Sequence, residues 1–153
     1  MNHILRNSAF ILLALLLLNS CNDEPVFSIV PEITFVSITP EQATQFTPDE
    51  VQLTLSYQDG DGDLGYEGEA TPNLFVEDTR AAFAGNPGRI SSYSVESLTP
   101  STRKPSIQGN ITITMPTPIY ESSEEPLVFR VYIVDRAGNS SNVIETTPIT
   151  ILP

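Results

Sequence analysis

Basic, thiol and imidazole side chains are scarce in this 153-residue chain, which holds seven Lys and Arg, one Cys, one His and no Trp. A single cysteine excludes a disulfide within the chain, so stability must come from the core or from a bound ion. The 19 Asp and Glu residues give a formal net charge of −12. Such an acidic protein lacks the basic face that binding to nucleic acid or to anionic lipid requires.

The first twenty residues have the pattern of an export signal. Arg6 precedes an apolar run over residues 9–18, which is too short to span a bilayer because a spanning helix needs ~20 apolar residues. The next residues, Leu18-Asn19-Ser20-Cys21, resemble the lipobox of bacterial lipoproteins. The resemblance implies cleavage before Cys21, acylation of Cys21 and anchoring in the outer membrane. The alternative is an ordinary secretory signal followed by an incidental cysteine.

Cleavage at that position would remove the signal peptide, residues 1–20, and with it His3, the only histidine. The mature chain could then form neither a Ser-His-Asp nor a Cys-His catalytic centre, nor a zinc site of His and Cys ligands. Residues 21–31 would form the lipidated cysteine and a tether. Their acids Asp23 and Glu24 resemble signals that send some Bacteroidota lipoproteins to the cell surface, and a solubilising spacer explains them equally well.

From residue 32 onward the chain has the pattern of an all-β protein. Apolar and polar residues alternate over 51–57 and 111–115, as in half-buried strands, and the more apolar run over 127–134 predicts a central strand. The expected strands lie at 33–38 (with a bulge), 51–57, 74–76, 111–115, 127–134 and 143–151. We therefore predict an Ig-like antiparallel β-sandwich of about seven strands over residues 32–153.

Residues 129–141 (FRVYIVDRAGNSS) resemble the F–G hairpin of fibronectin type III and bacterial Ig-like domains, which implies the same sandwich fold. The segment at about 79–106 does not fit a minimal sandwich, because glycine, proline and serine are frequent in it. We expect an irregular insert there. Its bases are Arg80, Arg89, Arg103 and Lys104, against the single acid Glu96. Such a segment could contact an anionic partner, pack on the acidic body or move freely.

Residues 57–65 (YQDGDGDLG) carry Asp59, Asp61 and Asp63 at alternate positions, separated by glycines. Three carboxylates this close repel one another unless a cation lies among them. The glycines permit the tight backbone curl through which the carboxylates can converge. Calcium takes six to eight oxygen ligands at ~2.3–2.6 Å in flexible geometry, which suits such a loop better than the strict octahedron of magnesium.

This stretch resembles the first half of an EF-hand loop, but Leu64 stands where an EF-hand has glycine and Ala70 where it has the bidentate glutamate. We therefore reject an EF-hand. A DGDGDLG-type segment after a strand is also similar to that of small Bacteroidota lipoproteins with an Ig-like domain. That resemblance implies the fold and a membrane location rather than an activity.

The alternation along two expected strands brings a fourth aspartate toward this loop. In the expected strands 51–57 and 127–134 the odd-numbered residues are apolar and should point into the core. The next odd-numbered residues are Asp59 and Asp135. Strands B and F of an Ig-like sandwich end at the same end of the core, so both aspartates should emerge there. We predict a calcium site of Asp59, Asp61, Asp63 and Asp135, joined by Glu67 or Glu69 and by a carbonyl near Leu64 or Gly65.

Two other interpretations of the acidic loop stay open at this point. Arg136 could neutralise the carboxylates as an ion pair, or the loop could be a solvated turn without an ion.

Together these features predict a lipid-anchored Ig-like module at the outer membrane or cell surface, calcium-stabilised and not an enzyme, with a role in adhesion or nutrient capture. Its partners would be the membrane, through Cys21, and an unidentified protein or glycan. One alternative is a docking subunit of a larger outer-membrane complex. A second is a metal-dependent hydrolase in which the acidic cluster activates water.

Overall fold

The computed structural model describes residues 26–46, 50–68, 71–80, 89–99, 105–119 and 126–153. The predicted signal peptide, Cys21 and the central part of the expected insert lie outside these ranges. Within them the chain forms β-strands, turns and irregular segments. Among these residues there is no helix of the length and apolar character that crossing a membrane would need.

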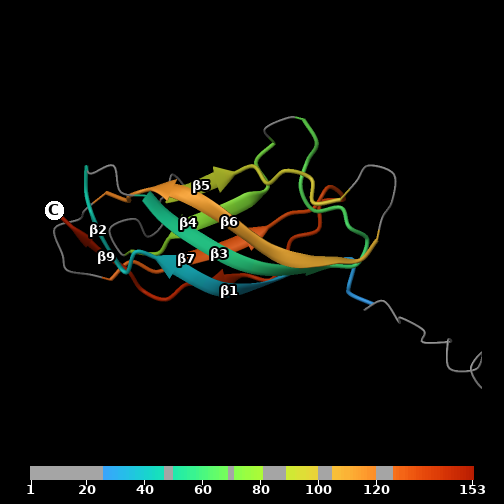
Figure 1. Ribbon diagram of the computed structural model, residues 1–153, viewed down its shortest axis with the longest axis horizontal. Coiled ribbons are helices and arrows are strands. Elements are labelled where there is room, and N and C mark those ends of the chain that lie inside the picture. The colour runs from blue at the N-terminus through green and yellow to red at the C-terminus, as the bar shows by residue number, and fades with distance from the viewer. Residues whose placement is uncertain (1–25, 47–49, 69–70, 81–88, 100–104, 120–125) are drawn as a thin grey trace, which may run out of the picture.

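The strands are arranged as two facing sheets and one small parallel pair (Figure 1). In chain order they are β1 (Glu32–Thr39), β2 (Gln42–Thr44), β3 (Glu50–Asp59), β4 (Leu74–Asp78), β5 (Ile90–Tyr93), β6 (Ile107–Pro116), β7 (Phe129–Ile133), β8 (Ile144–Glu145) and β9 (Thr150–Leu152). One sheet has the order β1-β3-β6 and the other β5-β4-β7-β8, while β2 pairs with β9. The predicted antiparallel β-sandwich is confirmed.

The core lies between the two sheets and follows the predicted alternation. Leu53 and Leu55 of β3 and Val131 and Ile133 of β7 are completely buried. The intervening residues point outward, and on that outer face the hydroxyls of Thr54 and Thr112 share a hydrogen bond of 2.9 Å between neighbouring strands. Each strand therefore contributes one apolar face to the sandwich, as its period-2 pattern predicts.

The predicted bulge in the first strand is present, because the register of β1 against β3 shifts between Phe35 and Ser37. The single strand predicted over 143–151 is wrong: β8 and β9 are separate elements. The amide of Phe129 donates to the Thr146 hydroxyl at 3.1 Å, in place of a backbone acceptor, and Pro148 has no amide to continue a ladder. The chain then crosses to pair β9 in parallel with β2.

The expected irregular insert contains a regular strand within its described part. Ile90–Tyr93 form β5, which pairs antiparallel with β4. Arg80, counted among the basic residues of the insert, is buried and forms an ion pair with Asp78. Arg80 therefore packs back on the acidic body.

The topology brings four segments to one end of the sandwich. There β3 ends at Asp59, β6 begins opposite it at Ile107, and β7 ends just before Asp135. The segment before β1 arrives at the same end, because Glu32 pairs with Gln58. Figure 1 shows this blue segment and the loop after β3 at one end and the C-terminus at the other.

Candidate metal centre

The three aspartates of the acidic loop converge as the sequence predicts. Asp59 is the last residue of β3, and Asp61 and Asp63 follow it in the loop. Each offers a carboxylate oxygen, and these oxygens all lie within 4.8 Å of one another. Asp59 is 0% exposed and Asp63 3%, so two of the three carboxylates are withdrawn from water. We call Asp59, Asp61 and Asp63 the Asp triad.

Glycine is required by the path of this loop at two positions. Gly62 and Gly65 have φ of 65° and 80°, in the left-handed region that disfavours side chains. A Cβ at Gly62 would collide with the carbonyl oxygen of Pro105, and one at Gly65 with that of Glu96. The glycines therefore let the loop curl and let two distant segments pack directly on its backbone.

Hydrogen bonds leave part of the triad unsatisfied. The Asp63 amide donates to Asp59 Oδ2 at 2.9 Å, which ties the two ends of the curl together. The Oδ1 atoms of Asp59 and Asp61 are buried, and neither accepts a hydrogen bond from the described residues. Because a buried carboxylate oxygen without a partner loses its hydration uncompensated, this arrangement favours a cation between the oxygens.

The electrostatics of Asp59 point the same way. Burial raises the pKa of Asp59, and the neighbouring charges of Asp61, Asp63 and Asp135 raise it further. The hydrogen bond from the Asp63 amide opposes this and lowers the pKa. The folded chain thus disfavours the charged form of Asp59, and a bound cation would remove that penalty.

Asp135 reaches this end of the core but has a different role from the triad. It is 0% exposed, as the strand alternation predicts. Its two carboxylate oxygens accept hydrogen bonds from the Asn139 amide at 2.7 Å and from Asn139 Nδ2 at 2.8 Å. Asp135 therefore anchors its own turn. It is not among the clustered ligand oxygens, although its charge acts on Asp59.

Arg136 pairs with the backbone of the acidic loop and not with its carboxylates. Its guanidinium donates to the carbonyls of Gly65 at 2.8 Å and Gly62 at 3.3 Å and to the Ser97 hydroxyl at 3.2 Å. Its amide donates to the Asp63 carbonyl at 3.2 Å. Sequence reasoning missed this clamp, because every residue has a carbonyl and no pattern shows which ones will face an arginine.

The structure describes only part of the further ligand set that the sequence suggests. Glu67 is exposed and Glu69 lies outside the described residues. The Leu64 carbonyl accepts the Leu98 amide at 3.3 Å, and the Gly65 carbonyl accepts Arg136. Among the described acidic side chains, the carboxylate oxygens of the Asp triad are the ligands that the geometry brings together. Such hard donors suit a hard divalent cation, with waters completing its shell.

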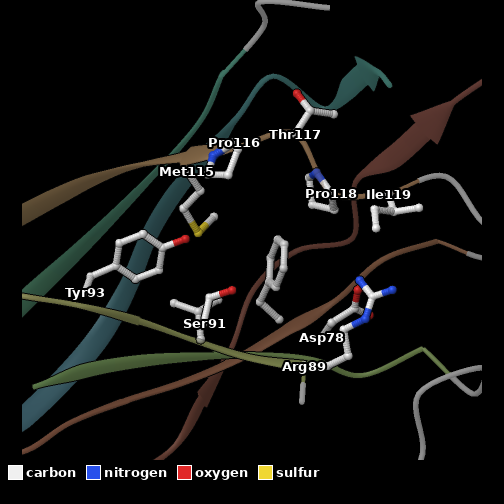
Figure 2. A pocket seen from close by; sticks show the side chains of 11 residues that line it. Asp78, Arg89, Ser91, Tyr93, Met115, Pro116, Thr117, Pro118 and Ile119 are labelled. Carbon is white, nitrogen blue, oxygen red and sulfur yellow. The ribbon is translucent and has the colours of Figure 1, made fainter. Parts of the chain in front are cut away.

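A second hollow lies toward the opposite end of the sandwich, between β5 and the end of β6. This cavity of about 200 Å³ is lined by apolar residues such as Val76, Met115 and Phe129 and by polar ones such as Asp78 and Ser91. Figure 2 shows Tyr93 and Met115 on one side of it and Asp78 and Arg89 on the other. Burial raises the pKa of Tyr93, and a side-chain hydrogen bond with Ser91 lowers it.

No protein-family model, curated protein or solved structure matches the chain. The chemistry of the Asp triad therefore has to be inferred from its own geometry.

Proposed function

We propose that this chain is a lipid-anchored β-sandwich module of the outer membrane, whose Asp triad holds one calcium ion that braces the loops at one end. Its role is binding or accessory, in adhesion or nutrient capture, and not catalytic. The observation that carries the metal site is the burial of Asp59 Oδ1 and Asp61 Oδ1 without hydrogen-bond partners among the described residues. The lipobox-like residues ending at Cys21 support the anchor.

Calcium is favoured over magnesium by the way the ligands are held. Calcium binds oxygens at ~2.3–2.6 Å, so two ligands of one ion lie at most about 5 Å apart, and the triad meets this limit. The three carboxylates come from alternate positions of one short loop, a flexible arrangement that calcium tolerates. Magnesium requires near-ideal octahedral geometry and retains several waters.

The ion would stabilise the end of the sandwich rather than drive a reaction. The loop contacts Pro105, Glu96 and Arg136, which belong to three separate segments of the chain. Holding the carboxylates together therefore also holds these segments in place. A surface built on loops needs such bracing, since loops carry few backbone ladder bonds of their own.

Isothermal titration calorimetry of the metal-free chain with calcium and with magnesium tests the site. We expect one calcium per chain, weaker magnesium binding, and a large loss of calcium affinity in Asp61→Asn. Glu145→Gln removes an exposed carboxylate from β8 and serves as the matched control. The absence of calcium binding at millimolar concentration would contradict the proposal.

The anchor is tested separately by intact mass measurement of the chain purified from membranes. We expect acyl groups on Cys21 and recovery in the membrane fraction, and both should be lost in Cys21→Ser. The accessory role is tested by affinity purification after mild solubilisation, compared between the wild type and Asp61→Asn.

A further inference from the structure

The segment before β1 exposes apolar side chains next to the acidic loop. Val26 is 96% exposed, Ile29 61% and Val30 43%, and all three fall within residues 26–30. Single exposed apolar residues on a surface need no explanation. Three of the five residues in this segment are exposed apolar residues, so an apolar phase that covered them would remove their surface from water.

This segment is held in place against the sandwich by hydrogen bonds. The Gly60 amide, between two residues of the Asp triad, donates to the Ser28 carbonyl at 2.8 Å. The Val30 amide donates to the Ser28 hydroxyl at 3.0 Å. Pro31 is buried. The backbone of the segment at Ser28 is therefore held at the end of the body that carries the triad, where Figure 1 shows the segment leaving the sandwich.

The distance to the lipid anchor limits where this end can lie. Cys21 precedes Val26 by five residues. An extended chain spans at most about 3.6 Å per residue, so the two Cα atoms lie no more than about 18 Å apart. An acylated Cys21 sits at the bilayer surface, whose polar interfacial layer is itself roughly 5–8 Å thick on each side. Val26 is consequently within reach of the membrane.

We propose that residues 26–30 dock on the lipid bilayer, with Val26, Ile29 and Val30 inserted among the headgroups, so that the triad end of the sandwich faces the membrane. The inference rests on the proposed acylation of Cys21. The attraction is apolar: a chain of net charge −12 gains nothing from anionic lipid, so docking occurs on zwitterionic membranes. The same negative charge repels a second copy of the chain, so a dimer contact is disfavoured as the partner of residues 26–30.

Spin labelling of the acylated full chain in phosphatidylcholine vesicles tests the docking. Acylation blocks Cys21, the only cysteine, so Ile29→Cys introduces the only free thiol. Thr147→Cys, at an exposed position toward the opposite end of the sandwich, is the matched control. Collision rates of each nitroxide with oxygen, which concentrates in lipid, and with a water-soluble nickel complex report the environment of the label.

We expect oxygen collisions to exceed nickel collisions at position 29 and the reverse at position 147. The oxygen preference should be lost when Val26→Ser and Val30→Ser are added to the position 29 label. Equal, water-like collision rates at both positions would overturn the docking. Shielding of the position 29 label from both reagents would also overturn it, because it would show that protein covers the segment. An oxygen preference unchanged by the serine substitutions would overturn it as well.

The anchor and the docking fail in distinguishable ways. A chain without acyl groups by mass measurement overturns the anchor and with it the docking. An acylated, membrane-bound chain whose position 29 label is exposed to water overturns the docking alone. Thermal melting of each labelled variant verifies that it is folded.

Discussion

Replacement of Asp61 by asparagine should have opposite effects with and without calcium. Asp61 lies between two buried aspartates, and its own Oδ1 is buried without a hydrogen bond. The substitution keeps the shape of the side chain and removes one of three mutually repelling charges. Without calcium the repulsion falls, so the midpoint of thermal unfolding should rise. With calcium the site has lost an anionic ligand, so the gain from the ion should shrink.

The size of the calcium effect follows from mass action. Extracellular calcium modules bind at ~10⁻⁴–10⁻³ M, so 10 mM calcium amounts to roughly 10–100 times the Kd. The ion then stabilises the fold by about 1.4–2.7 kcal/mol. At about 4 °C per kcal/mol for a domain of this size, the midpoint should rise by roughly 6–11 °C. If Asp61→Asn binds calcium about tenfold more weakly, calcium should raise its unfolding midpoint by only roughly 2–6 °C.

Differential scanning calorimetry of both proteins, in EDTA and in 10 mM calcium, provides the comparison. Glu145→Gln loses the same charge from an exposed position on β8 and should keep the full response. Calcium shifts of equal size in the wild type and in Asp61→Asn would refute the reasoning. A wild-type midpoint that is the same in EDTA and in calcium would refute it more directly.

Three further predictions concern the surroundings of the site. Because burial raises the pKa of Asp59 above its ordinary 3.8, the folded state binds this proton more tightly than the unfolded state. The stabilisation from protonated Asp59 is then fully present below pH 3.8 and is lost as the pH rises through the raised pKa. Urea denaturation without calcium, repeated at several pH values, should show this loss of stability in the wild type and not in Asp59→Asn. Gly65→Ala should cost about 2–4 kcal/mol, through left-handed strain plus a backbone clash, whereas Gly68→Ala, with φ of 73° and open space around it, should cost about 1–2 kcal/mol; urea denaturation compares the two. Asp135→Ala leaves the two amide groups of Asn139 without acceptors and should cost about 1–3 kcal/mol while most of the calcium response remains; calorimetric loss of calcium binding in this variant would instead make Asp135 a ligand.

The main strands and the triad could be predicted from sequence because both depend on short-range patterns. One face of each strand packs on the core, so the alternation along 51–57 and 127–134 predicts which residues are buried. The same alternation continues into Asp59 and Asp135, and both are completely buried. The spacing of the three aspartates of the loop likewise predicts their convergence, because it needs only a local curl.

Features that depend on pairing between distant segments could not be predicted in this way. The tail over 143–151 alternates well enough for one strand, yet it divides because β9 finds β2 as a parallel neighbour. Ile90–Tyr93 has weak strand character and becomes β5 because β4 offers it an edge. Arg136 has many possible acceptors, and the fold alone determines that it clamps the carbonyls of Gly62 and Gly65.

The sequence by itself determined the all-β class, the faces of the main strands and the convergence of the three aspartates in the acidic loop, because these follow from side-chain period and from the spacing of residues a few positions apart. Only the tertiary structure decided that Asp135 anchors a turn next to the triad and that the apolar segment before β1 lies against Gly60. Both depend on which loops the sandwich brings to one end. That choice is made by the packing of two sheets across the whole chain.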